Sequence, residues 1–367
     1  MKIKTLKEDL LKATQTVQNV ISPHTTLPIL SNILIEAIRD EVRLTATDLD
    51  IGISCLFSAK IEETGSITVP AKKLSDIFRE LPGEDIEISV KKNNAIEIKS
   101  EHSYFRLMGI PKDEFPKLPS FKDKEFINLP QNIFKRMLEV SSFAMSKDET
   151  RYILNGTLVE IKEDTIRIVT TDGRRLVLVE EERNFPRGIN KRIIIPLKTI
   201  YELLRNLSNE TDLKIAFNKN QISFEFNKTT IISRLIEGNF PEYEKVIPKE
   251  IKDNKVKVDK DEFYRAIKRV SLFTNPNSQA IKIDILKDKM ILSKTIPEIG
   301  EAKDQVDIDY KGENLSIGFN PNYLMEVLKV FEKDAIEIEL TDPQKPAVIR
   351  MNAPYKYIYV VLPMQLT

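Results

Sequence analysis

Cysteine, histidine and glycine are scarce in this sequence. Its 367 residues include one Cys, two His and 11 Gly. A single cysteine excludes an internal disulfide framework, and three Cys and His residues are too few ligands for a zinc cluster. No segment matches GxxxxGKS/T or GxGxxG, the glycine-rich loops that bind nucleotide phosphates through backbone amides. We therefore expect no cofactor, no metal centre and no ATP-driven chemistry.

An excess of charge of one sign is also missing. The chain has 56 Lys and Arg against 56 Asp and Glu, which gives a formal net charge of zero. The protein as a whole therefore offers no cationic coat for nucleic acid. A polyanionic partner would have to meet a local basic patch.

Long hydrophobic runs are absent as well. The longest stretch without Lys, Arg, Asp or Glu covers residues 13–35, and Thr, Gln, Asn, Ser and two prolines interrupt it. These residues are costly in hydrocarbon, so we expect no membrane span. The first residues lack the apolar segment of a secretory signal. Together with the single cysteine, this predicts a cytoplasmic protein.

What the sequence does contain is an internal repeat in three passes. Each pass opens with an amphipathic helical pattern, in which apolar residues recur at three- and four-residue spacing. These patterns begin at Lys7, Pro130 and Lys260. A second helical pattern follows about 60 residues later in each pass, and proline at or near its first turn is a usual start signal. The second patterns begin at Pro70, Pro196 and Asn320.

Alternating strands and Phe-Pro turns complete each pass. The segments 85–90, 212–217 and 335–340 alternate apolar and polar residues, which indicates antiparallel sheets with one wet face. Two passes end in a Phe-Pro turn, at 115–116 and 240–241. The sequence therefore predicts an α+β fold of three domains, 1–122, 123–248 and 249–367, each with two helices packed on antiparallel sheets.

Three such domains side by side would place helices on one surface and join their sheets edge to edge along the other. The two terminal sheet edges would then need a cover. A second copy, joined head to tail about a twofold axis, would give a closed ring of six repeats with twelve helices inside. Most of the helical segments carry a small surplus of Lys and Arg, so the hole would be mildly basic.

The chain resembles a known family, the bacterial DNA polymerase III beta subunit, or sliding clamp. The resemblance rests on segments that appear in order along the whole chain: TLPILSNILIE, LTATDLDIGIS, VPAKKLSDIFRELP, FPKLPSF, RYILNG, TTDGRRL, EGNFPEYEKVIP and YVVLPMQL. It implies a head-to-tail homodimeric ring that encircles duplex DNA and tethers the replicative polymerase by topology. It also implies a processivity factor and no enzyme, with weak DNA contact because tight phosphate binding would stop sliding.

The resemblance further implies a groove that binds a short peptide motif, built on Gln followed by Leu and Phe, of partner proteins. Partners would be the polymerase catalytic subunit, the clamp loader, repair polymerases, mismatch-repair proteins and ligase. The matching groove positions are Leu154, Thr171, Gly173, Arg174, Arg175, Leu176, Pro241, Val246, Val360, Leu362, Pro363 and Met364. Apolar side chains, a flexible Met and a glycine suit such a groove. The same residues could also be ordinary core, and Thr-Asp-Gly is a common turn.

Duplex and dimer contacts also follow from the resemblance. The DNA-contact positions are His24, Lys147, Arg151 and Tyr152, and the dimer positions are Phe105, Leu107, Leu272 and Phe273. His24 departs from the arginine often seen in that loop, so a fixed positive charge is not assured there. Gln365 stands where many relatives have arginine.

Two other functions compete with the clamp. A hydrolase could use the carboxylates Asp48, Asp50 and Asp172, but a two-metal site needs more converging carboxylates than one Asp-x-Asp supplies. A repeat scaffold that recruits proteins without DNA would use the same groove. Retention on circular but not linear DNA separates a clamp from a scaffold.

Overall fold

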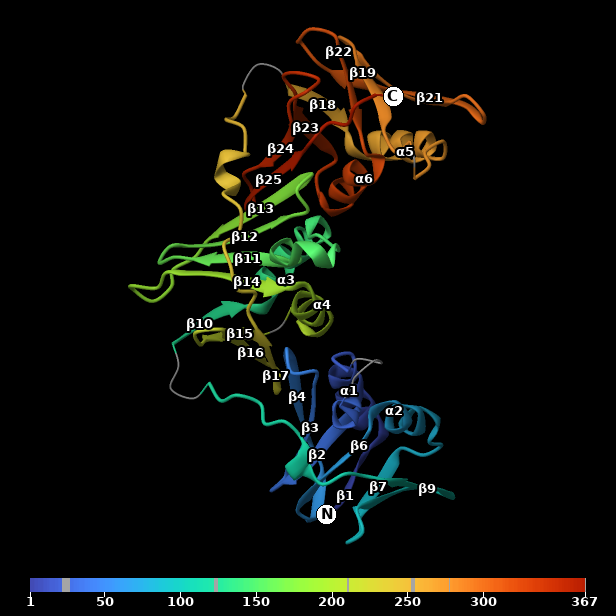
Figure 1. Ribbon diagram of the computed structural model, residues 1–367, viewed down its shortest axis with the longest axis vertical. Coiled ribbons are helices and arrows are strands. Elements are labelled where there is room, and N and C mark those ends of the chain that lie inside the picture. The colour runs from blue at the N-terminus through green and yellow to red at the C-terminus, as the bar shows by residue number, and fades with distance from the viewer. Residues whose placement is uncertain (22–26, 122–124, 210, 252–254, 277, 367) are drawn as a thin grey trace. The chain divides into compact units, whose positions relative to one another are not determined.

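The computed structural model describes residues 1–21, 27–121, 125–209, 211–251, 255–276 and 278–366. Figure 1 shows the course of the chain and its helices and strands. The chain forms two compact units. The first unit contains residues 1–135 and 198–235, and the second contains 136–197 and 236–367. No helix of the described residues is long and apolar enough to span a membrane.

One order of elements occurs three times: a strand, a helix, a group of strands, a second helix and three strands. The first repeat comprises β1 (Lys2–Leu6), α1 (Lys7–Gln18), β2 (Asn32–Ile38), β3 (Glu41–Thr47), β4 (Ile51–Ser58), β5 (Lys60–Glu63), β6 (Gly65–Pro70), α2 (Ala71–Glu80), β7 (Asp85–Val90), β8 (Ala95–Ser100) and β9 (Ser103–Met108). The second comprises β10 (Phe126–Pro130), α3 (Gln131–Glu139), β11 (Gly156–Ile161), β12 (Thr165–Thr171), β13 (Arg175–Glu182), β14 (Lys191–Pro196), α4 (Leu197–Asn206), β15 (Asp212–Phe217), β16 (Gln221–Phe226) and β17 (Thr229–Arg234). The third comprises β18 (Lys255–Asp259), α5 (Lys260–Ser271), β19 (Ile281–Ile285), β20 (Lys289–Ile296), β21 (Gly300–Asp309), β22 (Leu315–Phe319), α6 (Pro321–Val330), β23 (Ala335–Glu339), β24 (Ala347–Met351) and β25 (Lys356–Val361).

The six α-helices of the described ranges begin at the predicted starts or one residue after them, which confirms the helical part of the prediction. Each buries one apolar stripe. In α5 this stripe is Phe263, Ala266, Ile267 and Val270, which packs on β20, β21 and α6, and the carboxylate of Asp259 caps the helix by accepting from Glu262 N. The helix α3 ends earlier than its pattern, and a 3-10 turn, η3 (Ser142–Ala144), follows it.

Strand pairing repeats along the chain in the same way. The first strand of each repeat pairs antiparallel with the strand after the second helix, as β1 does with β7, β10 with β15 and β18 with β23. The sheets of the first unit have the orders β5-β1-β7-β8-β9 and β10-β15-β16-β17-β4-β3-β2-β6. The second unit holds one sheet of order β14-β11-β12-β13-β25-β24-β23-β18-β21-β20-β19-β22.

Two of these pairings join consecutive repeats. In the first unit β4 pairs with β17, the last strand of the second repeat. In the second unit β13 pairs with β25, the last strand of the third repeat. In both cases the third strand of the group that lies between the first strand and the last three strands of a repeat pairs with the last strand of the following repeat. The strands in this third position are β4, β13 and β21. By this rule β21 lacks a following repeat and β9 lacks a preceding one.

The turns before β4 and β13 have the same hydrogen bonds. In the first turn the Thr47 hydroxyl accepts from Leu49 N and donates to Ile51 O. In the second turn the Thr171 hydroxyl likewise accepts from Gly173 N and donates to Arg175 O. The next residue in each, an Asp, caps the turn by accepting from two following amides. The third position has positive φ in both turns, 85° at Gly173 and 81° at Leu49. Leucine is costly in this left-handed region, whereas glycine is not.

Replacement of Leu49 by glycine should therefore stabilise the protein. The side chain is about half exposed, so little packing is lost while the backbone strain is relieved. We expect a gain of about 0.5–1 kcal/mol in the free energy of unfolding, after the higher unfolded-state entropy of glycine is allowed for. This gain is measured by urea unfolding of the full chain, followed through the transition of the first unit. Leu49→Ala is the control, because it removes the side chain but keeps Cβ; an equal gain in Leu49→Ala would show that strain at this position is not the cause.

Candidate functional site

An apolar cavity of about 360 Å³ lies in the second unit. The turn between β12 and β13 forms one wall, the segment around η5 (Tyr243–Lys245) forms another, and the end of β25 closes it. Its lining residues are Leu154, Thr171, Gly173, Arg174, Arg175, Leu176, Pro241, Glu242, Tyr243, Val246, Pro346, Val360 and Leu362. The surface of the lining is largely apolar, as in sites that take small apolar ligands.

Ten of the twelve groove residues expected from the sequence line this cavity. The other two, Pro363 and Met364, line a second cavity of about 450 Å³ in the same unit, where Met364 N donates to Gly318 O at 2.8 Å. The sequence missed Glu242, Tyr243 and Pro346. The first two lie between the predicted Pro241 and Val246, so that segment could have pointed to them, whereas no pattern marks Pro346.

The lining combines core and exposed side chains. Leu176 and Val360 are both 4% exposed and belong to a buried cluster of the second unit. Val246 and Leu362 are 56% and 42% exposed. The core interpretation therefore holds for the floor of the cavity, while the rim offers apolar side chains to a ligand.

Polar contacts of Tyr243 fix the η5 wall. Its hydroxyl donates to Glu160 Oε2 at 2.6 Å and accepts from Arg167 Nη1 at 2.8 Å, and Arg167 Nε in turn donates to Glu180 Oε2 at 2.6 Å. Burial, helped by the hydrogen bond to Glu160, raises the pKa of Tyr243 above its usual value, so this hydroxyl stays protonated. The wall is thus fastened to β11, β12 and β13.

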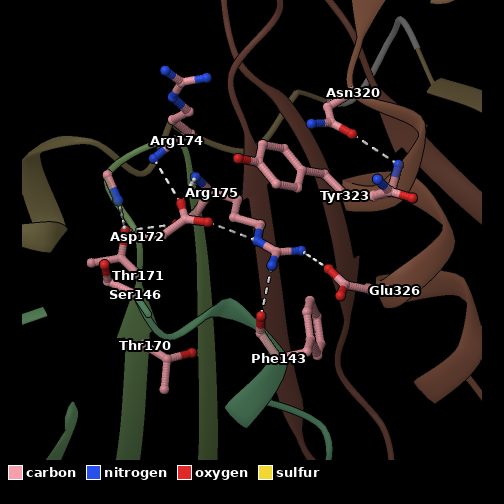
Figure 2. A network of polar contacts seen from close by, with 12 residues as sticks. Phe143, Ser146, Thr170, Thr171, Asp172, Arg174, Arg175, Asn320, Tyr323 and Glu326 are labelled. Carbon is pink, nitrogen blue, oxygen red and sulfur yellow. Dashed lines mark hydrogen bonds and ion pairs between the residues drawn. The ribbon is translucent and has the colours of Figure 1, made fainter. Parts of the chain in front are cut away.

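A second polar network fixes the β12–β13 turn (Figure 2). Arg175 is 8% exposed, and its Nε donates to Asp172 Oδ2 at 3.1 Å and its Nη2 to Phe143 O at 2.7 Å. Its Nη1 donates to Glu326 on α6. The guanidinium carbon lies 4.4 Å from the ring centroid of Tyr323 and 5.3 Å from that of Phe143.

The neighbouring Arg174 is placed differently. Its amide donates to Asp172 Oδ1 at 2.9 Å, while its side chain points away from the network (Figure 2). Burial alone would lower the pKa of Arg175, but Tyr359, Glu326 and Asp172 together raise it above its ordinary value. Of the two adjacent arginines, one is held inside the protein and the other extends from the rim.

The structure places the remaining predicted residues as follows. Lys147 is exposed, and Arg151 and Tyr152 lie exposed on η4 (Glu149–Leu154), where Arg151 Nη1 donates to Asp172 O at 3.3 Å. His24 lies outside the described residues. Phe105 and Leu107 lie, partly buried, on β9 of the first unit; in the second unit Leu272 and Phe273 follow α5, with Leu272 79% exposed.

The carboxylates weighed for catalysis are engaged in structural contacts. Asp48 caps its turn and pairs with Lys198 on α4. Asp172 caps the equivalent turn and binds Arg175, and Asp50 lies 3.6 Å from Arg234 Nη1. These contacts account for the three side chains without a catalytic role.

Comparison with known proteins decides the family. Models of the DNA polymerase III beta subunit N-terminal, central and C-terminal domains match residues 1–119, 128–242 and 244–365. The chain belongs to the DNA polymerase III beta subunit family. It is 33% identical to the beta sliding clamp of Chlamydia pneumoniae, over 100% of this chain and 99% of that protein.

Solved structures agree with this membership. The DNA polymerase sliding clamp of Bacillus subtilis is 30% identical with a TM-score of 0.95, and each chain is covered completely. The sliding clamp of Pseudomonas aeruginosa bound to griselimycin is 32% identical, also with a TM-score of 0.95 and complete coverage of both chains. This beta subunit therefore consists of three clamp domains, and it is a DNA sliding clamp, a processivity factor and not an enzyme.

Removal of the Tyr243 hydroxyl should destabilise the second unit. Tyr243→Phe removes the shorter of the two hydrogen bonds to Glu160 Oε2, the other coming from Arg167 Nη1 at 3.3 Å, and it removes one acceptor of Arg167. We expect a loss of about 1–3 kcal/mol in the free energy of unfolding, measured by denaturant titration. Tyr152→Phe is the matched control, because that ring is 58% exposed. Equal effects of the two substitutions would contradict a fastening role for the Tyr243 hydroxyl.

Proposed function

We propose that two copies of this chain close head to tail into a ring around duplex DNA, and that the apolar cavity of the second unit binds short peptide segments of replication and repair proteins. The family membership supports the clamp role. The single observation that carries the peptide-binding part of the proposal is the cavity, which brings together ten residues expected from the sequence.

Strand pairing supports the dimer. Among the described residues β9 pairs only with β8, and β21 pairs along its length with β20 but with β18 only at Ile308 and Asp309. Within the chain, each equivalent third strand pairs with the last strand of the next repeat. A second copy would satisfy the same rule by pairing its β9 with β21, which covers both open edges. Phe105, Leu107, Leu272 and Phe273 are the proposed contact residues.

The cavity suits a peptide with two or three apolar anchors. Its buried floor, around Leu176 and Val360, offers a dry pocket, and the exposed rim residues Val246 and Leu362 add contact area. Gly173 permits close approach of a ligand backbone. Pro363 and Met364 would extend the site through the second cavity. A sliding clamp of the family has been solved with griselimycin bound, which agrees with ligand binding by such proteins.

Contact with DNA would be weak and electrostatic. Lys147, Arg151 and Tyr152 are exposed and are the proposed contacts in the described part of the chain, with His24 a further candidate. The formal net charge of zero fits a protein that encloses DNA without gripping it, because neutralising many phosphates would give strong, salt-dependent binding.

The proposal includes the organisation and the setting of the protein. The three domains would extend over 1–122, 123–248 and 249–367. The proposed partners are the replicative polymerase catalytic subunit, the clamp loader, repair polymerases, mismatch-repair proteins and ligase, in the cytoplasm.

Charge at the proposed dimer seam should produce monomers. Leu272 is highly exposed, so Leu272→Asp together with Phe273→Asp should disturb the interface more than the fold of the second unit. We expect the mass measured by light scattering to fall from that of two chains to one. The control is Leu49→Asp, which adds a charge at an exposed position of the β3–β4 turn and should leave the dimer intact. An unchanged dimer mass in the double variant would refute this seam.

Peptide binding tests the cavity. A fluorescent Gln-Leu-Ser-Leu-Phe peptide should bind saturably in the micromolar range, about 8 kcal/mol of binding free energy, by fluorescence anisotropy. Val246→Asp places a charge on the apolar rim and should weaken binding at least about tenfold without unfolding the protein. Leu49→Asp is again the control. No binding by the wild-type chain up to millimolar concentration would overturn the groove.

Retention on circular and linear DNA distinguishes a clamp that encircles DNA from a scaffold that does not. The dimer, loaded onto nicked circular DNA by a clamp loader, should stay bound through gel filtration and leave once the circle is cut. Retention that is equal on linear and circular DNA would contradict encirclement.

A further inference from the structure

Arg175 lines the proposed groove, yet its charged group is already engaged by the protein. Its three nitrogens donate to Asp172, Glu326 and the Phe143 carbonyl, and its plane packs against the rings of Tyr323 and Phe143 (Figure 2). A ligand would have to displace two carboxylates to reach the guanidinium. The side chain is therefore poorly placed to be a direct ligand contact.

The contacts of Arg175 connect two repeats beside the cavity. Asp172 and Phe143 belong to the second repeat, whereas Glu326 and Tyr323 lie on α6 of the third. Asp172 also caps the β12–β13 turn through the amides of Arg174 and Arg175. The guanidinium thus ties the turn that forms one wall of the cavity to a helix of the next repeat. Glu326 itself lies outside the cavity lining.

The junction between the first and second repeats provides an internal comparison. The turn before β4 has the same hydrogen bonds as the turn before β13, but the first residue of β4 is Ile51 where β13 begins with Arg175. The sixth residue of α4 is Glu202 where α6 has Glu326. No arginine stands at this strand start. Within the described part of the chain Glu202 Oε2 has no hydrogen-bond partner, while Oε1 accepts from Arg205 Nη1, and burial raises the pKa of this carboxyl.

The first junction nevertheless forms without such an arginine. There β4 still pairs with β17, and Lys198 on α4 bonds to Asp48 and to Val20 O. An arginine between the turn and the helix is therefore not needed to join two repeats in this fold. The Arg175 contacts occur at the junction where the apolar cavity lies.

We propose that Arg175, through Glu326 and Asp172, is a positioning residue that holds the β12–β13 turn against α6 and so keeps the peptide-binding cavity in its binding shape. This inference rests on the proposed function of the cavity. It assigns to Glu326, which lies outside the cavity lining, an effect on ligand affinity.

The two possible roles of Arg175 predict opposite effects of Glu326→Ala. If Arg175 positions the wall, loss of its partner releases the turn, and affinity for the fluorescent Gln-Leu-Ser-Leu-Phe peptide should fall about tenfold, mainly through faster dissociation. If Arg175 bound the ligand directly, Glu326→Ala would free the guanidinium and affinity would stay equal or rise. Arg175→Lys should lose a similar factor, because one ammonium cannot meet three acceptors in a fork.

Controls separate positioning from general stability. Glu202→Ala, at the matching position of α4, should leave peptide affinity unchanged. Affinities are measured at a temperature at which circular dichroism shows each variant fully folded. Because Arg175 and Glu326 act as one unit, the combined variant Arg175→Lys, Glu326→Ala should bind no more weakly than either single variant.

The outcomes are distinguishable. If the wild-type protein fails to bind the peptide, the proposed function of the cavity fails. If the wild-type protein binds but Glu326→Ala binds equally well, the positioning role fails while the groove stands. Should Glu326→Ala not fold, Arg175→Lys decides, since full affinity in that variant also overturns the inference.

Discussion

Backbone pairing between consecutive repeats is the constraint on which the rest of this structure depends. The strands β4 and β17, and again β13 and β25, bond main chain to main chain, so each repeat is completed by the one that follows. The pairing sets the register of the turns that precede β4 and β13, and at the second junction it brings the end of β25 beside Leu176. The cavity is thus a product of how the sheets join, since neither repeat alone supplies its walls.

Local patterns predicted the elements well because their causes are local. Proline near the first turn and apolar residues at helical spacing determined where α2, α4 and α6 begin, and period-2 alternation determined β7, β15 and β23. The early end of α3 was not visible, because Val140, Phe143 and Ala144 continue the apolar spacing while the chain turns into η3. The positive φ of Leu49 was also hidden, since leucine gives no sign of a left-handed position.

The site was predicted from a family resemblance more than from its own chemistry. The lining residues come from five separate stretches of chain, and no spacing rule connects Leu154 with Val360. The contacts of Tyr243 and Arg175 were out of reach for the same reason, because Glu160 and Glu326 lie 83 and 151 residues away from them in the sequence. Long-range polar pairs of this kind become visible only when the sheets are assembled.

The two-repeat origin of the cavity has a thermodynamic consequence for the assembled molecule. A ligand that contacts both the β12–β13 turn and the end of β25 binds the joined junction and not the separated strands. By mass action it adds RT ln(1 + [L]/Kd) to the free energy needed to part them, about 2.7 kcal/mol at a hundredfold excess over Kd. An occupied cavity therefore reinforces its own seam, and the proposed ring would open more readily where no ligand bridges two repeats.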